Sequence, residues 1–181
     1  MERVLAFEYG HSFFRLRALM LAALFVAVLV FFAFQTQTPA VWLGILAATF
    51  LSYLVIVGLS PLLTRHQLTR SRIILRQGWY FRAILPFAEV ETVSPWDGEP
   101  KYGLRLSLAR RSLFVVGSGR DLVSVRLREW RRFPLVLFLK AREVVFDVDD
   151  RDAFLAAVEA RVAAGEPLPA RKVPILPDAR R

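Results

Sequence analysis

Two long uncharged stretches near the N-terminus constrain this chain more than any other feature. Every residue from Ala18 to Phe34 is apolar, and the stretch from Ala40 to Leu63 contains no charge. A helix needs about 20 apolar residues to cross a hydrocarbon core of roughly 30 Å. We therefore predict a transmembrane hairpin over residues 16–63, with its turn in the segment "QTQTP".

A cleaved signal peptide is the alternative interpretation of the first stretch, because basic residues precede its apolar core. No convincing small-residue cleavage site follows Phe34, and the next residues lead directly into the second stretch. The pattern therefore favours two spans.

Basic residues lie on the outer sides of the hairpin, whereas its turn carries no charge. By the positive-inside rule, both termini are predicted to be cytoplasmic. Residues 1–15 are expected to form a cytoplasmic segment, either a short amphipathic element in the interface or an irregular lead-in. The residues predicted to anchor the hairpin at the two interfaces are Phe13, Phe14, Arg15, Arg17, Trp42 and Arg65.

The sequence offers little catalytic chemistry. Neither apolar stretch contains the acid, base or histidine that an ion pathway or proton relay normally needs. The chain has no cysteine, and its two histidines are not accompanied by a nucleophile motif. The segment "GSGR", residues 117–120, lacks the spacing and the lysine of a phosphate-binding loop and predicts a tight hairpin turn. We therefore expect a protein that is not an enzyme and has no cofactor or metal.

After Leu63 the pattern changes to alternating apolar and polar residues, which is typical of strands with one buried face. About seven strands separated by short turns are predicted, a spacing that suggests a sandwich or a barrel. The last element is a helix, with Asp149 or Asp150 as N-cap, Phe154 and Val158 on its apolar stripe, and Gly165 as its stop. The proline-rich residues 165–181 are expected to form an extended tail.

The segment "LTRSRIILRQGWYFRAILPFAEVETV", residues 68–93, resembles the opening of the bacterial pleckstrin-homology-like domain, whose membrane-anchored members carry transmembrane helices just before it. The resemblance implies an α+β membrane protein with two N-terminal transmembrane helices and a domain over residues 64–164. That domain would be a seven-stranded antiparallel barrel capped by a C-terminal helix. Members of the family are chiefly non-enzymatic, and one branch resembles assembly factors of photosynthetic complexes. No set of phosphoinositide-binding residues carries over to this sequence.

Seven consecutive apolar residues, 133–139, exceed what one wall of an antiparallel barrel needs, and Pro134 argues against a central strand. Leaving them in water would cost roughly 1.5–3 kcal/mol for each large side chain. They therefore dip into the membrane interface, dock on another membrane protein, or are covered by the chain itself. The residues predicted to make contacts with a partner or the membrane are Trp130, Arg131, Arg132, Phe133, Leu135, Leu137, Phe138, Lys140 and Arg142.

The formal charge of +9 favours an anionic partner. Nucleic acid is not expected, because no nucleic-acid motif is present and the domain is tethered to a membrane. The leading hypothesis is an accessory subunit or assembly factor of an inner-membrane complex, with other membrane-protein subunits as partners. The alternative is an anionic-lipid sensor that holds headgroups through Arg131, Arg132, Lys140 and Arg142.

Overall fold

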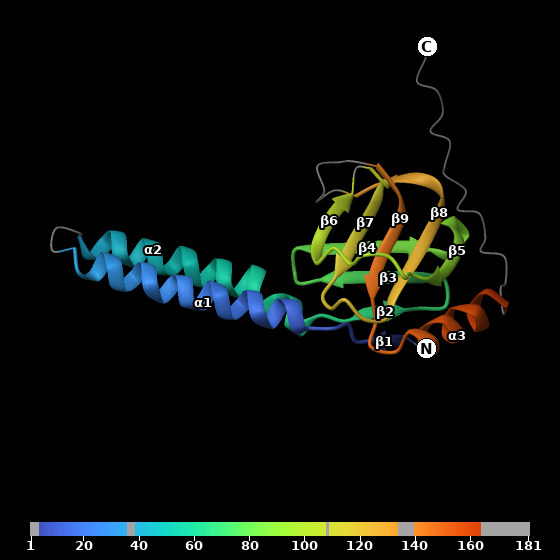
Figure 1. The fold of residues 1–181 in the computed structure, drawn as a ribbon, viewed down its shortest axis with the longest axis horizontal. Coiled ribbons are helices and arrows are strands. Elements are labelled where there is room, and N and C mark those ends of the chain that lie inside the picture. Colours follow the sequence, from blue (N-terminus) through green and yellow to red (C-terminus); the bar gives the residue numbers. More distant parts are fainter. Residues whose placement is uncertain (1–3, 36–38, 108, 134–139, 164–181) are drawn as a thin grey trace, which may run out of the picture.

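The computed structural model describes residues 4–35, 39–107, 109–133 and 140–163. Helices α1 (Ser12–Ala33) and α2 (Ala40–Tyr53) lie side by side and project away from a β-rich body (Figure 1). The second helix continues as a π-helical segment, Leu54–Leu59, and a 3-10 segment, Ser60–Leu63. The helical stretches Ser12–Ala33 and Ala40–Leu63 are both long and apolar enough to cross a membrane, as predicted.

The β-rich body consists of two sheets. Sheet A has the order β1-β2-β3-β4 and contains β1 (Leu5–Phe7), β2 (His66–Leu68), β3 (Arg72–Gln77) and β4 (Phe81–Pro86). Sheet B has the order β5-β8-β9-β7-β6 and contains β5 (Val90–Pro95), β6 (Gly103–Ser107), β7 (Ser112–Val116), β8 (Leu122–Arg132) and β9 (Lys140–Asp147). The short 3-10 helix Phe87–Glu89 connects the two sheets.

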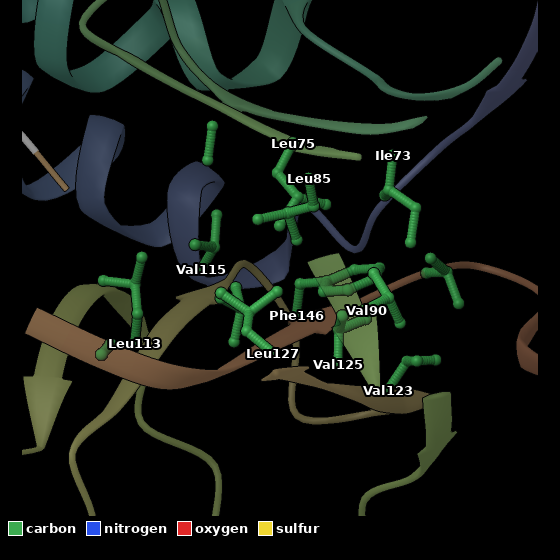
Figure 2. Packing of buried hydrophobic residues seen from close by; sticks show 14 of the residues in the cluster. Ile73, Leu75, Leu85, Val90, Leu113, Val115, Val123, Val125, Leu127 and Phe146 are labelled. Carbon is green, nitrogen blue, oxygen red and sulfur yellow. The ribbon is translucent and has the colours of Figure 1, made fainter. Parts of the chain in front are cut away.

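The main core lies between the two sheets. Figure 2 shows Ile73, Leu75 and Leu85 of sheet A facing side chains of sheet B such as Val115 and Val125. All five are at most 2% exposed. The alternating pattern of the sequence follows from this arrangement, because every second side chain of a strand points to the same face of the sheet.

The prediction of an α+β protein with two apolar N-terminal helices is confirmed, but the closed seven-stranded antiparallel barrel is wrong. The described residues form nine strands in two separate sheets. Strands β7 and β9 also pair in parallel. The barrel failed as a prediction because alternation identifies strands and their buried faces, but it does not specify which strands pair.

The prediction of a tight hairpin turn at residues 117–120 is also wrong. Strands β7 and β8 flank this segment, yet β9 lies between them and pairs with both. The connection therefore spans the width of one strand. Asp121, at its end, has a φ of 50°, a left-handed conformation in which aspartate is tolerated better than most residues.

Part of the N-terminal segment is a β-strand rather than an irregular lead-in. Residues 5–7 form β1, which pairs with β2 in register Leu5 to Leu68. Helix α1 then begins at Ser12, inside the segment that was expected to precede the span. The chain therefore enters the β-rich body before it enters the first apolar helix.

The C-terminal helix α3 (Arg151–Ala163) is confirmed. Asp150 caps it, because its Oδ1 accepts the backbone N–H of Ala153 at 2.9 Å. Phe154 and Val158 are buried in the main core, and the Phe154 ring meets Phe7 of β1 edge-on at 5.1 Å. Helix α3 therefore covers one side of the core, on the side of the body away from the helical hairpin (Figure 1). The predicted tail, residues 165–181, lies outside the described residues.

Candidate functional site at the base of the helical hairpin

Tyr9 joins the N-terminal segment to the end of the second apolar helix. Its side chain is 1% exposed, and its hydroxyl donates a hydrogen bond to the Pro61 carbonyl. The same hydroxyl is hydrogen-bonded to Thr64 Oγ1 at 2.8 Å. Burial raises the pKa of this phenol, so it stays protonated and available as a donor. Tyr9 therefore fixes the point at which the chain leaves the helices.

His66 stacks on Tyr9, with ring centroids 4.6 Å apart. Its Nδ1 accepts the backbone N–H of Arg76 at 3.3 Å. Complete burial lowers the pKa of this imidazole to about 3, so the ring is neutral at physiological pH. A histidine with such a low pKa is a poor general base, and its role here is packing and backbone pairing.

Asp147, at the end of β9, is the third buried member of this junction. One of its oxygens accepts the N–H of Gly117 at 2.9 Å, and the other accepts those of Gly10 and Ser118 at 2.9 and 2.7 Å. Burial nevertheless raises the pKa of the carboxyl to about 6, although the three N–H groups favour the charged form. Asp147 therefore ties the N-terminal segment to the β7–β8 connection.

The raised pKa predicts a pH-dependent contribution of Asp147 to stability. Because the folded-state pKa of about 6 exceeds the ordinary 3.8, the folded protein binds this proton more tightly than the unfolded chain. The contribution of Asp147 to stability is complete at pH values below the ordinary pKa of 3.8 and is lost as the pH rises through 6. Two pKa units correspond to about 3 kcal/mol. We expect the stability of the wild type relative to Asp147→Asn to fall by about that amount between pH 4 and pH 7.

Denaturant unfolding of both proteins in detergent, at several pH values, measures this difference. The other titrating groups are common to both proteins, so they cancel in the comparison. Parallel pH profiles for the wild type and Asp147→Asn would contradict the prediction.

Close packing completes the junction between α1 and sheet B. The N–H of Phe13 donates to the Gly117 carbonyl at 3.1 Å, and the fully buried Phe14 ring meets Tyr9 edge-on at 6.0 Å. A Cβ at Gly117 would lie 2.2 Å from the Gly10 carbonyl oxygen and 2.6 Å from the Phe14 ring. The backbones approach each other so closely that only glycine fits at position 117.

The polar groups of this site hold separate parts of the chain together. The phenol of Tyr9 and the carboxylate of Asp147 are each committed to at least two hydrogen bonds across the junction. Within the described ranges, no group of three or more His, Asp or Glu residues is placed to hold a metal ion.

The predicted interfacial anchors differ in how far their side chains are buried. Phe14 is wrong as an anchor, because it is 0% exposed and packs inside the junction. Phe13 is half-buried and stacks on Tyr102 at 5.5 Å. Trp42 is 63% exposed at the far end of the hairpin, and Arg65 is paired with Glu8 at 2.7 Å. Arg15 is exposed and Arg17 half-buried, both in the first turns of α1.

The predicted contact segment is only partly a surface. Phe133 is wrong as a contact residue, because it is 2% exposed and belongs to the main core. Trp130 is 44% exposed, and the Arg111 guanidinium lies 5.1 Å from its ring centroid. Leu135, Leu137 and Phe138 lie outside the described residues.

The four cations of this segment also differ from one another. Arg131 pairs with Glu89, and Arg142 pairs with Glu91 at 3.0 Å. Arg142 Nε also donates to the Leu127 carbonyl at 3.0 Å. Arg132 and Lys140 are exposed and lie opposite each other on β8 and β9. Two of the four cations are therefore already neutralised by the chain's own glutamates.

The sequence alone did not reveal the junction, because its members are far apart along the chain. Tyr9 and Asp147 are separated by more than a hundred residues, and each one on its own resembles an ordinary strand or loop residue. The glycines at positions 10 and 117 were the available signal, since isolated glycines beside strands mark close backbone approach.

No family model matches this chain, and searches of curated proteins and of solved structures found no match either.

Proposed function

We propose that this chain is a non-enzymatic, membrane-anchored accessory subunit or assembly factor that binds other proteins of a bacterial inner-membrane complex, such as a photosynthetic or respiratory one. The observation that carries the proposal is the junction at Tyr9, His66 and Asp147. Around them, Tyr9 is bonded to Pro61 and Thr64 at the end of the second apolar helix, and the Phe13 N–H in α1 donates to the Gly117 carbonyl, so the β-rich body is fixed to both helices. A body held this way presents one fixed surface to neighbouring membrane proteins.

The exposed helices support the anchoring part of the proposal. Large apolar side chains are exposed along both helices, among them Leu19, Val26, Phe31, Ile45 and Leu51. Each of these is at least half exposed, which water would penalise by roughly 1.5–3 kcal/mol per fully exposed side chain. A bilayer removes that penalty. The basic flanks then place both termini and the β-rich body in the cytoplasm by the positive-inside rule.

Trp130 is the best candidate for the protein contact on the β-rich body. Its half-exposed ring is already stacked against Arg111, so little side-chain freedom is lost on binding. Tryptophan and arginine are the residues that most often dominate the energy of a protein interface. The exposed Arg132 and Lys140 would then form part of its polar rim.

The ion pairs of Arg131 and Arg142 favour a protein partner over the anionic-lipid alternative. A cation gains about 1 kcal/mol beside an anionic headgroup. Leaving an exposed ion pair costs about 0.2–1 kcal/mol, so the net gain for these two residues is small.

Replacing Trp130 with alanine is expected to weaken partner binding by about 2 kcal/mol or more, which is roughly 30-fold in Kd. Mild-detergent purification of the wild type followed by mass spectrometry should recover partners at fixed stoichiometry, and Trp130→Ala should lose them while remaining in the membrane fraction. Val162→Ala, which shortens a 59% exposed side chain on α3, is the control and should retain the partners. A wild-type protein recovered alone would refute the proposed function.

A further inference from the structure

Trp79 is an exposed aromatic residue whose position is fixed by the apolar helices. It lies in the turn between β3 and β4, and 64% of it is exposed. Figure 1 shows that this turn is on the side of the β-rich body from which the hairpin projects. Among the described residues, no other aromatic ring and no cation is stacked on this indole.

The turn is bonded to the end of the second apolar helix. The backbone N–H of Trp79 donates to Ser60 Oγ at 3.1 Å, and the backbone N–H of Gly78 donates to Thr64 Oγ1 at 3.0 Å. Gly78 has a φ of +63°, and a Cβ there would lie 2.4 Å from Ser60 Oγ. Position 78 therefore requires glycine for its conformation and for the close contact. Trp79 is held at the level where the helix ends.

The surroundings of Trp79 are those of a membrane interface. Leu59 and Leu63, in the final turns of the same span, are large apolar side chains that are 41% and 71% exposed. Next to Trp79, Tyr80 is half-buried, and its pKa is raised by burial and partly lowered again by the charge of Arg17. The aromatic residues of the turn therefore lie near the end of the apolar span and near the Arg17 guanidinium.

We propose that Trp79 inserts into the headgroup layer of the phospholipid bilayer that the hairpin spans, so that the β3–β4 turn is a membrane contact in addition to the two helices. The inference rests on the anchoring part of the proposed function. Indole rings are enriched at this depth because their apolar body enters the acyl boundary while the N–H stays hydrated. A lipid occupant is favoured over a protein because the turn is hydrogen-bonded to the end of the apolar span and the positive charge of Arg17 lies near it.

This contact has a consequence for the body as a whole. The junction fixes the body relative to the hairpin, but hairpin and body together can still tilt in the bilayer. A contact at the β3–β4 turn fixes the tilt as well, and with it the direction in which Trp130 is presented to a partner. The membrane contact of Trp79 would therefore preorganise the protein contact, which reduces the entropy lost on binding.

The chain contains no cysteine, so single cysteines for spin labelling can be introduced into the otherwise unchanged full chain. We would compare three variants in phosphatidylcholine–phosphatidylglycerol vesicles: Trp79→Cys, Ala27→Cys within α1, and Glu159→Cys on the exposed face of α3. Nitroxide power saturation with oxygen and with a water-soluble nickel chelate reports the depth of each label. The label at position 79 is expected at headgroup depth, at position 27 in the acyl region, and at position 159 in water.

The outcomes separate the inference from the proposed function. A label at position 79 as accessible to nickel as that at position 159, with position 27 deep, overturns the inference and leaves the anchoring intact. A label at position 27 in water overturns the anchoring and the proposed function with it. As a second measurement, lipids brominated at shallow acyl positions should quench wild-type fluorescence, and the quenched signal should decrease in Trp79→Phe. Equal quenching in the two proteins would also overturn the inference.

Discussion

Phe14→Ala is expected to lower the free energy of unfolding by about 3–5 kcal/mol, the usual cost of removing a buried phenylalanine ring. Phe14 is 0% exposed and packs edge-on against Tyr9, whose hydroxyl reaches the end of the second apolar helix. The cavity would therefore open between the helices and the sheets. For a chain of this size, such a loss corresponds to a fall in Tm of roughly 10 °C.

The matched control for this substitution is Phe31→Ala. Phe31 lies on the same helix but is 61% exposed, so removing its ring leaves no cavity. Thermal unfolding of the three proteins in one detergent, followed by near-ultraviolet circular dichroism, should show a large fall for Phe14→Ala and little change for Phe31→Ala. Equal effects of the two substitutions would mean that the ring of Phe14 is not part of a packed joint.

Gly117→Ala is expected to destabilise the protein by about 3 kcal/mol, at the upper end of the range for overpacked sites. The added Cβ would lie 2.2 Å from the Gly10 carbonyl oxygen, a backbone atom that cannot rotate away. Its other close neighbour, the ring of Phe14, is confined by burial. Relieving the overlap requires a backbone shift that strains the hydrogen bonds from Gly117 N–H to Asp147 and from Phe13 N–H to the Gly117 carbonyl.

Gly44→Ala makes the same chemical change without the overlap, because no atom outside the adjoining helix backbone lies within 4 Å of a Cβ at that position. In the middle of α2 it should be neutral or stabilising, since alanine favours helix by about 1 kcal/mol over glycine. The cost of Gly117→Ala should also be smaller when it is combined with Phe14→Ala, because the missing ring provides space. Additive effects in that double mutant would contradict the packing described here.

Phe14→Ala and Gly117→Ala both weaken the packing that fixes the β-rich body to the helices, on which the proposed function depends. If the junction loosens, the hairpin can still insert in a membrane, but the β-rich body no longer holds Trp79 and Trp130 in a fixed orientation. We therefore expect junction variants to stay in the membrane fraction and to lose partner binding. Localisation and binding would thus be separated by changes far from the contact surface.

The sequence by itself determined the local elements of this protein. Uninterrupted apolar residues produced two helices, because a long run without charges can satisfy its backbone only internally once it leaves water. Alternation produced strands such as β8, and an aspartate before an apolar stripe produced α3 with Asp150 as its cap. These elements depend on neighbours a few residues apart, which a sequence pattern records directly.

Only the tertiary structure decided how those elements are joined. The insertion of β9 between β7 and β8, the pairing of β1 with β2, and the burial of Phe133 all depend on contacts between distant residues. The same holds for the junction, where Asp147 connects the N-terminal segment to the β7–β8 connection only because the N–H groups of Gly10 and Gly117 donate to it. Several pairings satisfy the same apolar pattern, and the one adopted is selected by packing and hydrogen bonding over the whole body.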